Sequence, residues 1–411
     1  MQKLSRRHFL YSTLLPLLCG TGLRNPEKVS KQFFFTSQGK TAVINIDGSG
    51  LRFLDFNQPG QVTWQPAGFF PGGQKILLLS MEERRDGPGK PFSEYYTQTP
   101  THIWSYDMTD GKLTELATRN RMAVFYTPAL LLANDRMLVQ VSKNKTTQIF
   151  NMRLDGSDAI AFTQPEDGVP YGLSMRPDGK KVAFHIAGPA GYEIFVSDTD
   201  GRNRLKIMGK PDHLYFGTSW SPDGKWILYV DCHQTVDPGH DWADVCISSA
   251  DGKEHRILTK DQAMWFASSY GNDTQHGNGS NVPAWTTDGK VIFPCRLPGS
   301  KVPWEYNAGK TDTDHFNRTY KPALAKGSVS ICSIDIDTLA IKSLTNPGDG
   351  YWDFRASQSP DGKHIVFCRV KTGAMPSIWL MHSDGSEAKK ITDGYNGLGA
   401  DHPRWMPLQN S

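Results

Sequence analysis

Several features that would assign a chain to a well-known class are missing from these 411 residues. The formal net charge is only +3 and the basic residues are scattered, which argues against a nucleic-acid partner. No Cys-x-x-Cys pair occurs, so a zinc ribbon or a thioredoxin-like site has no support. No Gly-x-Ser-x-Gly stretch occurs either, and the nucleophile elbow of the α/β-hydrolases is therefore excluded. Long helical periodicity is also absent, which favours a chain built from strands.

What the chain has is a short polar turn that recurs between apolar runs. It is seen in "SMRPDGKKVAFHI" (174–186), "SWSPDGKWILYV" (219–230) and "SQSPDGKHIVFC" (357–368). Proline fixes φ at the first central position of such a turn and glycine accepts the positive φ, so each copy predicts a tight hairpin. A second hairpin with an Asp-Gly turn follows, as in "EIFVSDTDGRNRLKI" (193–207). Each period therefore carries four short strands, the content of one propeller blade.

Counting these periods predicts an all-β fold, a seven-bladed β-propeller formed by residues 31–411 as a single domain. A seventh blade begins at Asp401 and is completed by strands from 33–56, so that the N- and C-terminal strands close the last blade and remove exposed sheet edges. Six or eight blades are the alternative counts. The six other inner strands are predicted to begin near Pro66, Pro128, Gly172, Gly217, Val282 and Arg355.

The N-terminus differs in kind from the repeats. "SRRHFLY" (5–11) is basic, and the apolar "STLLPLLCG" (12–20) that follows is too short to span a bilayer. The segment resembles a twin-arginine export signal, in which Arg6 and Arg7 precede a Phe-Leu pair. The resemblance implies that residues 1–30 are a signal peptide and that the protein is exported to the periplasm or the medium of a bacterium. No membrane span is expected, and the protein is expected to be a monomer.

The cysteines allow two readings. Cys232 with Cys246, and Cys295 with Cys332, fall in neighbouring predicted strands. In an oxidising compartment each pair would form a disulfide. The alternative is that all four are small buried thiols.

The long connections are predicted to lie on one face of the ring. They join second to third strands or successive blades, and span 81–101, 233–241, 260–280 and 297–327. Most histidines fall in or beside them, and so do many aromatic residues. This face is therefore predicted to carry the functional site.

The candidate residues on this face suit an acidic sugar. The candidate catalytic residues are His276, His233, His402, Arg355 and Arg318. A histidine would remove a proton and an arginine would neutralise a carboxylate. The candidate substrate-binding residues are Trp265, Tyr270, Trp304, Tyr306, Trp352, Asn281 and Arg404. For the three tryptophans the alternative is that they anchor the long loops from inside.

Arg355 and His402 occupy the same register in adjacent inner strands, where the other blades have small or apolar residues. They are expected to meet near the mouth of the channel. A divalent metal (manganese, zinc, iron or calcium) is a further hypothesis, with His213, His233, His240 and His276 as ligands. No other cofactor is predicted.

The repeat "SPDGK…I.F…IW..D.DG…..LT" resembles that of the TolB-type, WD40-like propellers over most of residues 33–407. The histidine-rich face is more weakly similar to that of polysaccharide lyases such as oligogalacturonate lyase. The second resemblance implies a lyase that acts on acidic oligosaccharides or polysaccharides by β-elimination. The first implies a noncatalytic propeller that binds a glycan or a protein partner. Both hypotheses stay open at the level of sequence.

Overall fold

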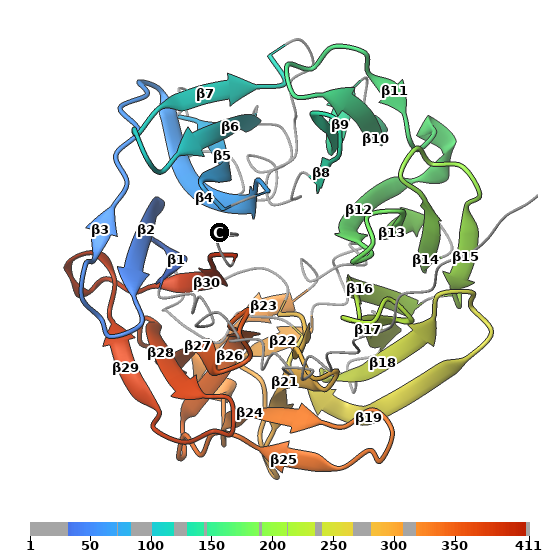
Figure 1. Cartoon of the computed structure of the whole chain (residues 1–411). Coiled ribbons are helices and arrows are strands. Elements are labelled where there is room, and N and C mark those ends of the chain that lie inside the picture. The colour runs from blue at the N-terminus through green and yellow to red at the C-terminus, as the bar shows by residue number, and fades with distance from the viewer. Residues whose placement is uncertain are drawn as a thin grey trace, which may run out of the picture.

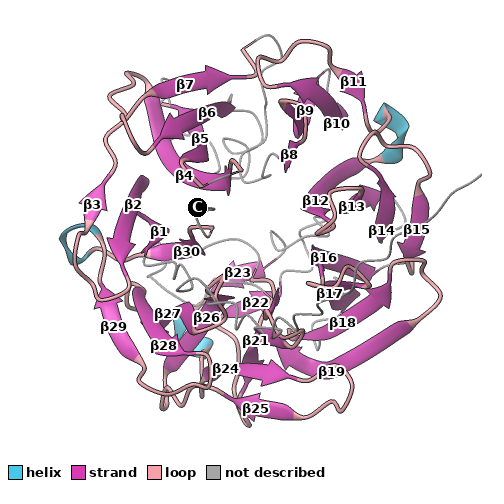
Figure 2. Cartoon of the chain, in the orientation of Figure 1, coloured by secondary structure: helices cyan, strands magenta, loops and turns pink. Residues whose placement is uncertain are grey.

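The computed structural model describes residues 32–407 except for 72, 84–100, 119–129, 144–145, 189–190, 212, 235–240, 266–280 and 307–317. These residues form a ring of small sheets around a central axis (Figure 1). Strands dominate, and the described helices are short 3-10 turns at Pro165–Asp167 (η1), Pro322–Leu324 (η3) and Tyr395–Gly397 (η4) (Figure 2). The predicted all-β propeller fold is confirmed.

Three sheets of four strands follow one another along the chain. The first contains β4 (Gln61–Phe69), β5 (Lys75–Glu82), β6 (Thr101–Asp107) and β7 (Leu113–Leu116). The second contains β8 (Leu130–Leu132), β9 (Arg136–Lys143), β10 (Thr146–Arg153) and β11 (Ile160–Ala161). The third contains β12 (Val169–Met175), β13 (Lys181–Gly188), β14 (Gly191–Asp198) and β15 (Leu205–Met208).

The next part of the ring is one continuous sheet of 12 strands. It begins with β16 (His213–Trp220), β17 (Trp226–Gln234), β18 (Ala243–Ser249) and β19 (His255–Ala263). It continues with β20 (Ala284–Trp285), β21 (Val291–Arg296), β24 (Val329–Ile334) and β25 (Ile341–Ser343). It ends with β26 (Tyr351–Gln358), β27 (His364–Lys371), β28 (Ser377–His382) and β29 (Lys389–Thr392). A separate hairpin pairs β22 (Trp304–Tyr306) with β23 (Arg318–Tyr320).

The ends of the described chain close the ring. The last sheet has the order β3-β2-β1-β30, with β1 (Gln32–Ser37), β2 (Lys40–Asn45), β3 (Arg52–Phe53) and β30 (Asp401–Trp405). Phe33 is paired with Trp405 in antiparallel register, and their rings meet edge to face at 5.5 Å between centroids. The predicted closure of the last blade by strands from the two ends of the chain is confirmed (Figure 1).

Both faces of each central strand are covered, because the sheets stand around the axis and pack face to face. Ile227 and Leu228 are neighbours in β17 whose side chains point to opposite faces, and both have no exposed surface. The same is true of Val366 and Phe367 in β27. The uninterrupted apolar runs after each Pro-Asp-Gly turn are explained by this two-sided burial.

The inner strands begin earlier than the sequence predicted. β12, β16 and β26 start at Val169, His213 and Tyr351, whereas the expected starting residues Gly172, Gly217 and Arg355 lie inside these strands. At each of the three the register with the next strand shifts, and each has a positive φ. The residues expected at the strand starts are thus β-bulges, which bend an inner strand without ending it.

The five described cysteines are free and buried, in agreement with the thiol alternative. Cys246 lies opposite Tyr229 rather than Cys232, whereas Cys332 lies diagonally across the ladder from Cys295 and their thiols share a hydrogen bond. The long connections join the strands that were predicted, namely β5 to β6, β17 to β18, β19 to β20 and β21 to β24. None of the described helices has the length and apolar character needed to cross a membrane.

Candidate functional site

The first cluster of charged residues lies where β26 and β30 run side by side. Nη1 of Arg355 donates to Oδ2 of Asp401 and lies 3.3 Å from Nδ1 of His402. Oδ1 of Asp401 accepts from the His402 N–H at 2.6 Å and from Sγ of Cys368 at 3.3 Å. Asp401 therefore holds Arg355 and His402 together, and the two residues meet as the sequence predicted. We call Arg355, Asp401 and His402 the channel cluster.

The backbone of the channel cluster is strained. Arg355 and His402 have φ of +51° and +54°, in the left-handed region that suits glycine. The equivalent bulges in other inner strands carry Gly172 and Gly217, with φ of +70° and +71°. A left-handed residue that is not glycine costs about 1–2 kcal/mol. Strain of this kind persists where the surrounding structure imposes it, and it is common at functional sites.

Asn281 fixes this strained backbone from the neighbouring part of the sheet. Its Oδ1 accepts from the Arg355 N–H at 3.0 Å, and its Nδ2 donates to the Met264 carbonyl at 2.8 Å. Its own N–H donates to the Trp265 carbonyl at 2.8 Å. Asn281, predicted to bind substrate, is buried and uses its amide to position Arg355.

The charges around His402 keep its imidazole neutral. Burial, together with the positive charges of Arg355 and Arg404, lowers the pKa of His402 to about 3, although Asp401 acts in the opposite direction. At neutral pH the ring therefore has a lone pair that can accept a proton. Its side chain is 28% exposed, so a ligand in the channel can reach it.

A cavity of about 350 Å³ lies among the inner strands and contains Arg404. Its size falls within the range of small-molecule sites. The other lining residues come from β4, β8 and β12 or their ends and are mostly apolar: Ala67, Gly68, Phe69, Leu130, Leu131, Leu173, Ser174 and Met175. An apolar wall with one guanidinium suits a ligand that has an apolar face and a carboxylate.

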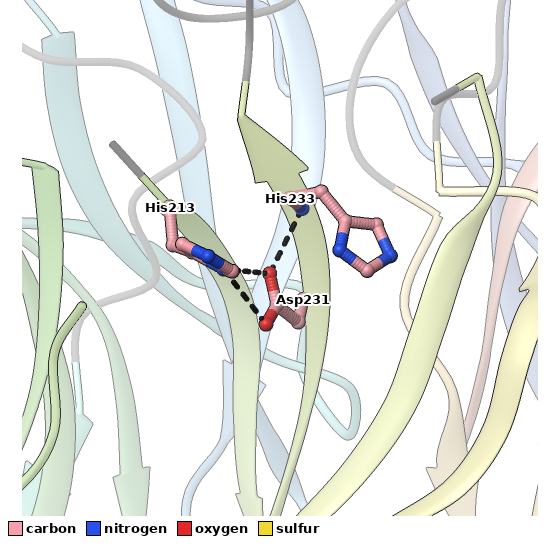
Figure 3. Close-up of side chains that lie close together, drawn as sticks. All are labelled: His213, Asp231 and His233. Atoms are coloured by element: carbon pink, nitrogen blue, oxygen red, sulfur yellow. Dashed lines mark hydrogen bonds and ion pairs between the residues drawn. The ribbon is translucent and has the colours of Figure 1, made fainter. Parts of the chain in front are cut away.

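A second cluster lies at the loop-bearing end of β16 to β19, and each of these strands contributes to it. Its members are His213, Asp231, His233, Asp244 and Asp261. Nδ1 of His213 lies 2.9 Å from Oδ1 of Asp231, which also accepts from the His233 N–H at 2.8 Å. Figure 3 shows the ring of His213 directed at the Asp231 carboxylate, which also contacts the backbone nitrogen of His233 on the same strand as Asp231. We call the five residues the blade cluster.

The remaining two aspartates surround the ring of His233. Nε2 of His233 lies 3.2 Å from Oδ1 of Asp244 and 3.6 Å from Oδ1 of Asp261. The hydrogen bond to Asp244 raises the pKa of His233, against the effect of burial. His213, Asp231 and His233 form one group of potential metal ligands, and His233, Asp244 and Asp261 form another.

The three tryptophans predicted to bind substrate are buried. Trp265, Trp304 and Trp352 are 1%, 3% and 0% exposed. Nε1 of Trp304 donates to Asp241 at 3.1 Å and Nε1 of Trp352 donates to Thr372 at 2.9 Å. This burial favours the alternative that these tryptophans anchor loops.

The structure describes the remaining predicted residues only in part. Tyr306 and Arg318 face each other across the β22–β23 hairpin, and the structure describes their backbones alone. Tyr270, His240 and His276 lie outside the described residues. Of the four predicted metal ligands, His213 and His233 come together.

The sequence analysis missed the aspartates, namely Asp401, Asp231, Asp244 and Asp261. Asp401 directly precedes His402, and Asp231 stands two residues before His233. Both could have been found from these spacings at predicted strand ends. The other two are separated from their partners by ten residues or more, and only the strand pairing brings them together.

Comparisons with known proteins support the fold. No family model matches the sequence. An uncharacterized protein of Agrobacterium fabrum is 41% identical over 73 residues, which is 18% of this chain and 24% of that protein. The match thus spans about a quarter of that relative's length.

Solved propellers resemble the chain in structure at low sequence identity. The oligogalacturonate lyase solved in complex with manganese has a TM-score of 0.52 at 14% identity, covering 89% of this chain and 86% of the lyase. A putative 6-phosphogluconolactonase from Bacteroides uniformis has a TM-score of 0.51 at 13% identity, covering 91% and 99%. A putative TolB from Agrobacterium tumefaciens has a TM-score of 0.44 at 15% identity, covering 86% and 98%. The similarity to the lyase and to the lactonase shows a β-propeller fold.

Proposed function

We propose that the protein is an exported propeller enzyme that acts on acidic oligosaccharides or polysaccharides by β-elimination at the channel cluster. The observation that carries the proposal is the 3.3 Å contact between Nη1 of Arg355 and Nδ1 of His402, which lies two residues before the cavity-lining Arg404 in β30. A neutral imidazole can remove a proton from the carbon next to a carboxylate while a neighbouring guanidinium stabilises the negative charge that develops.

Arg404 binds the uronate carboxylate, because its side chain is exposed within the channel. Arg355 is 8% exposed and ion-paired with Asp401, so it adds positive charge to the site without leaving its place. Positive charge near the carboxylate stabilises the carbanion-like transition state and makes the neighbouring proton more acidic. The bound carboxylate also offsets the two arginine charges, which raises the pKa of His402 and makes it a stronger base.

The β-elimination needs one base and one proton donor. His402 takes the proton from the carbon next to the carboxylate, and the electron pair left behind forms a carbon–carbon double bond. The bond from the next carbon to the glycosidic oxygen breaks, and that oxygen takes a proton from a tyrosine, a histidine or water. The products are an unsaturated uronate and a shorter saccharide, with no oxidant or reductant involved.

A divalent metal has no step in this reaction. Manganese, zinc or calcium could neutralise a uronate carboxylate, but His213 and His233 come from β16 and β17, whereas Arg355 and His402 come from β26 and β30. Arginine supplies the charge that the carboxylate requires.

The remaining parts of the proposal concern the whole chain. The 12-stranded sheet is three successive blades, which with the four separate four-stranded sheets makes seven blades in one domain of residues 31–411. Residues 1–30 are a twin-arginine signal peptide, and the mature protein acts as a monomer in the periplasm or outside the cell.

The test follows the ultraviolet absorbance after the purified mature protein is mixed with each of a panel of uronate-containing polysaccharides. The unsaturated product of β-elimination absorbs ultraviolet light. We expect the absorbance to rise, and we expect His402→Asn to lower the rate of this rise by at least about 100-fold. The matched control is His382→Asn, which changes a half-exposed histidine in β28. Saccharide binding with no absorbance rise on any substrate would overturn the enzyme proposal and leave the noncatalytic glycan-binding propeller.

A further inference from the structure

We infer that the blade cluster is a binding site for one divalent first-row transition-metal ion, held by His213, Asp231 and His233. It is separate from the proposed catalytic site and does not depend on the proposed reaction. Two imidazoles and a carboxylate are ligands that zinc, manganese and iron accept, whereas magnesium and calcium take oxygen ligands. The potential ligand atoms of the three residues lie within 4.8 Å of one another.

The site is built into the fold rather than lying on a mobile surface. The side chains of His213, Asp231 and His233 are only 20%, 11% and 22% exposed. His213 begins an inner strand and the other two end its neighbour, so the sheet ladder fixes their separation. His233 has a φ of +56°, a left-handed conformation that the structure must impose.

Asp244 supplies the support that metal-binding histidines usually have. It is 5% exposed, and its Oδ1 lies 3.2 Å from Nε2 of His233 and accepts from the Asp261 N–H at 2.8 Å. A carboxylate on one ring nitrogen orients an imidazole so that its other nitrogen binds a metal.

The charge balance also favours a cation. The blade cluster contains three carboxylates and two imidazoles, and among the described residues none of the three aspartates is ion-paired with lysine or arginine. The three carboxylates thus outnumber the two imidazoles. A divalent ion removes this imbalance.

His102 shows how a histidine looks when ion pairs alone hold it. Its Nδ1 lies 2.7 Å from Glu115 and its Nε2 lies 3.0 Å from Glu82, so the two carboxylates occupy opposite sides of the ring. The three groups do not converge on a common point. In the blade cluster, by contrast, potential ligand atoms of His213, Asp231 and His233 all lie within 4.8 Å of one another.

The test measures metal binding without substrate. Protein stripped with a chelator and dialysed against zinc, manganese or calcium should retain one zinc or manganese ion per chain and no calcium. At a hundredfold excess over Kd the ion should raise the Tm by about 5 °C. His213→Asn and Asp231→Asn should each weaken binding at least about tenfold.

Two controls separate a lost ligand from a lost fold. His102→Asn removes a histidine with carboxylate partners and should leave the affinity unchanged. Asp261→Asn alters an exposed member of the blade cluster and should keep the fold while weakening binding by less than His213→Asn. Metal retention that persists in both His213→Asn and Asp231→Asn, or no retention by the wild-type protein, would overturn the proposal whether or not the protein is a lyase.

Discussion

His402 and His233 are both histidines in left-handed backbone near an aspartate, yet they lie in electrostatic surroundings of opposite sign. Arg355 and Arg404 add to the effect of burial at His402 and lower its pKa, whereas the hydrogen bond to Asp244 raises that of His233. The first imidazole is therefore neutral at neutral pH, whereas the second is held among carboxylates. The comparison shows that the neighbours, rather than the histidine itself, decide the chemistry.

The two clusters should differ most in the free energy of unfolding that is lost when one aspartate of each cluster is replaced by alanine. Asp401→Ala removes the carboxylate that is ion-paired with the buried guanidinium of Arg355, which costs about 3–5 kcal/mol. Asp261→Ala removes a half-exposed carboxylate and should cost less than about 1 kcal/mol. Urea unfolding of the metal-free variants measures both values. Equal losses would show that the two clusters do not differ in burial as we describe.

The second difference is in the response to pH. The folded pKa of His402 is about 3, below the value of about 6.5 expected in the unfolded chain, so the unfolded state binds the proton first as the pH falls. The stability linked to His402 is complete above pH 6.5 and declines as the pH drops toward 3.

Allowing for the partial exposure of the ring, the decline should be about 2–3 kcal/mol. His402→Asn should remove that part of the acid sensitivity, because asparagine does not titrate and tolerates a positive φ. His382→Asn should leave the sensitivity unchanged. Unfolding curves at a series of pH values make the comparison, and an unaltered decline in His402→Asn would contradict it.

The sequence predicted the channel cluster better than the blade cluster. The Pro-Asp-Gly repeat fixed the hairpins, and the shared register of Arg355 and His402 brought them together correctly. Only part of the blade cluster was predicted. His213 and His233 were expected as metal ligands, whereas the carboxylates come from strand ends whose proximity depends on strand pairing. The burial of Trp265 and Trp352 was also undecided, because loop anchors and sugar platforms use the same side chain.

The smallest expected effect on stability comes from the backbone strain at Arg355, in the bulge of β26. Arg355→Gly and Arg355→Ala both remove the guanidinium, but only glycine adopts a φ of +51° without steric cost. We expect Arg355→Gly to be more stable than Arg355→Ala by about 1 kcal/mol. Chemical denaturation of the pair gives this value directly. If the alanine variant were equally stable, the left-handed backbone would not be imposed by the fold.

The division of roles between the two clusters is tested most directly by a crystal structure of the protein soaked with zinc and an unsaturated-uronate oligosaccharide. The account predicts an anomalous peak among His213, Asp231 and His233, and the uronate carboxylate against Arg404 within reach of His402. A metal peak between Arg355 and His402, or the sugar bound over the blade cluster, would contradict it.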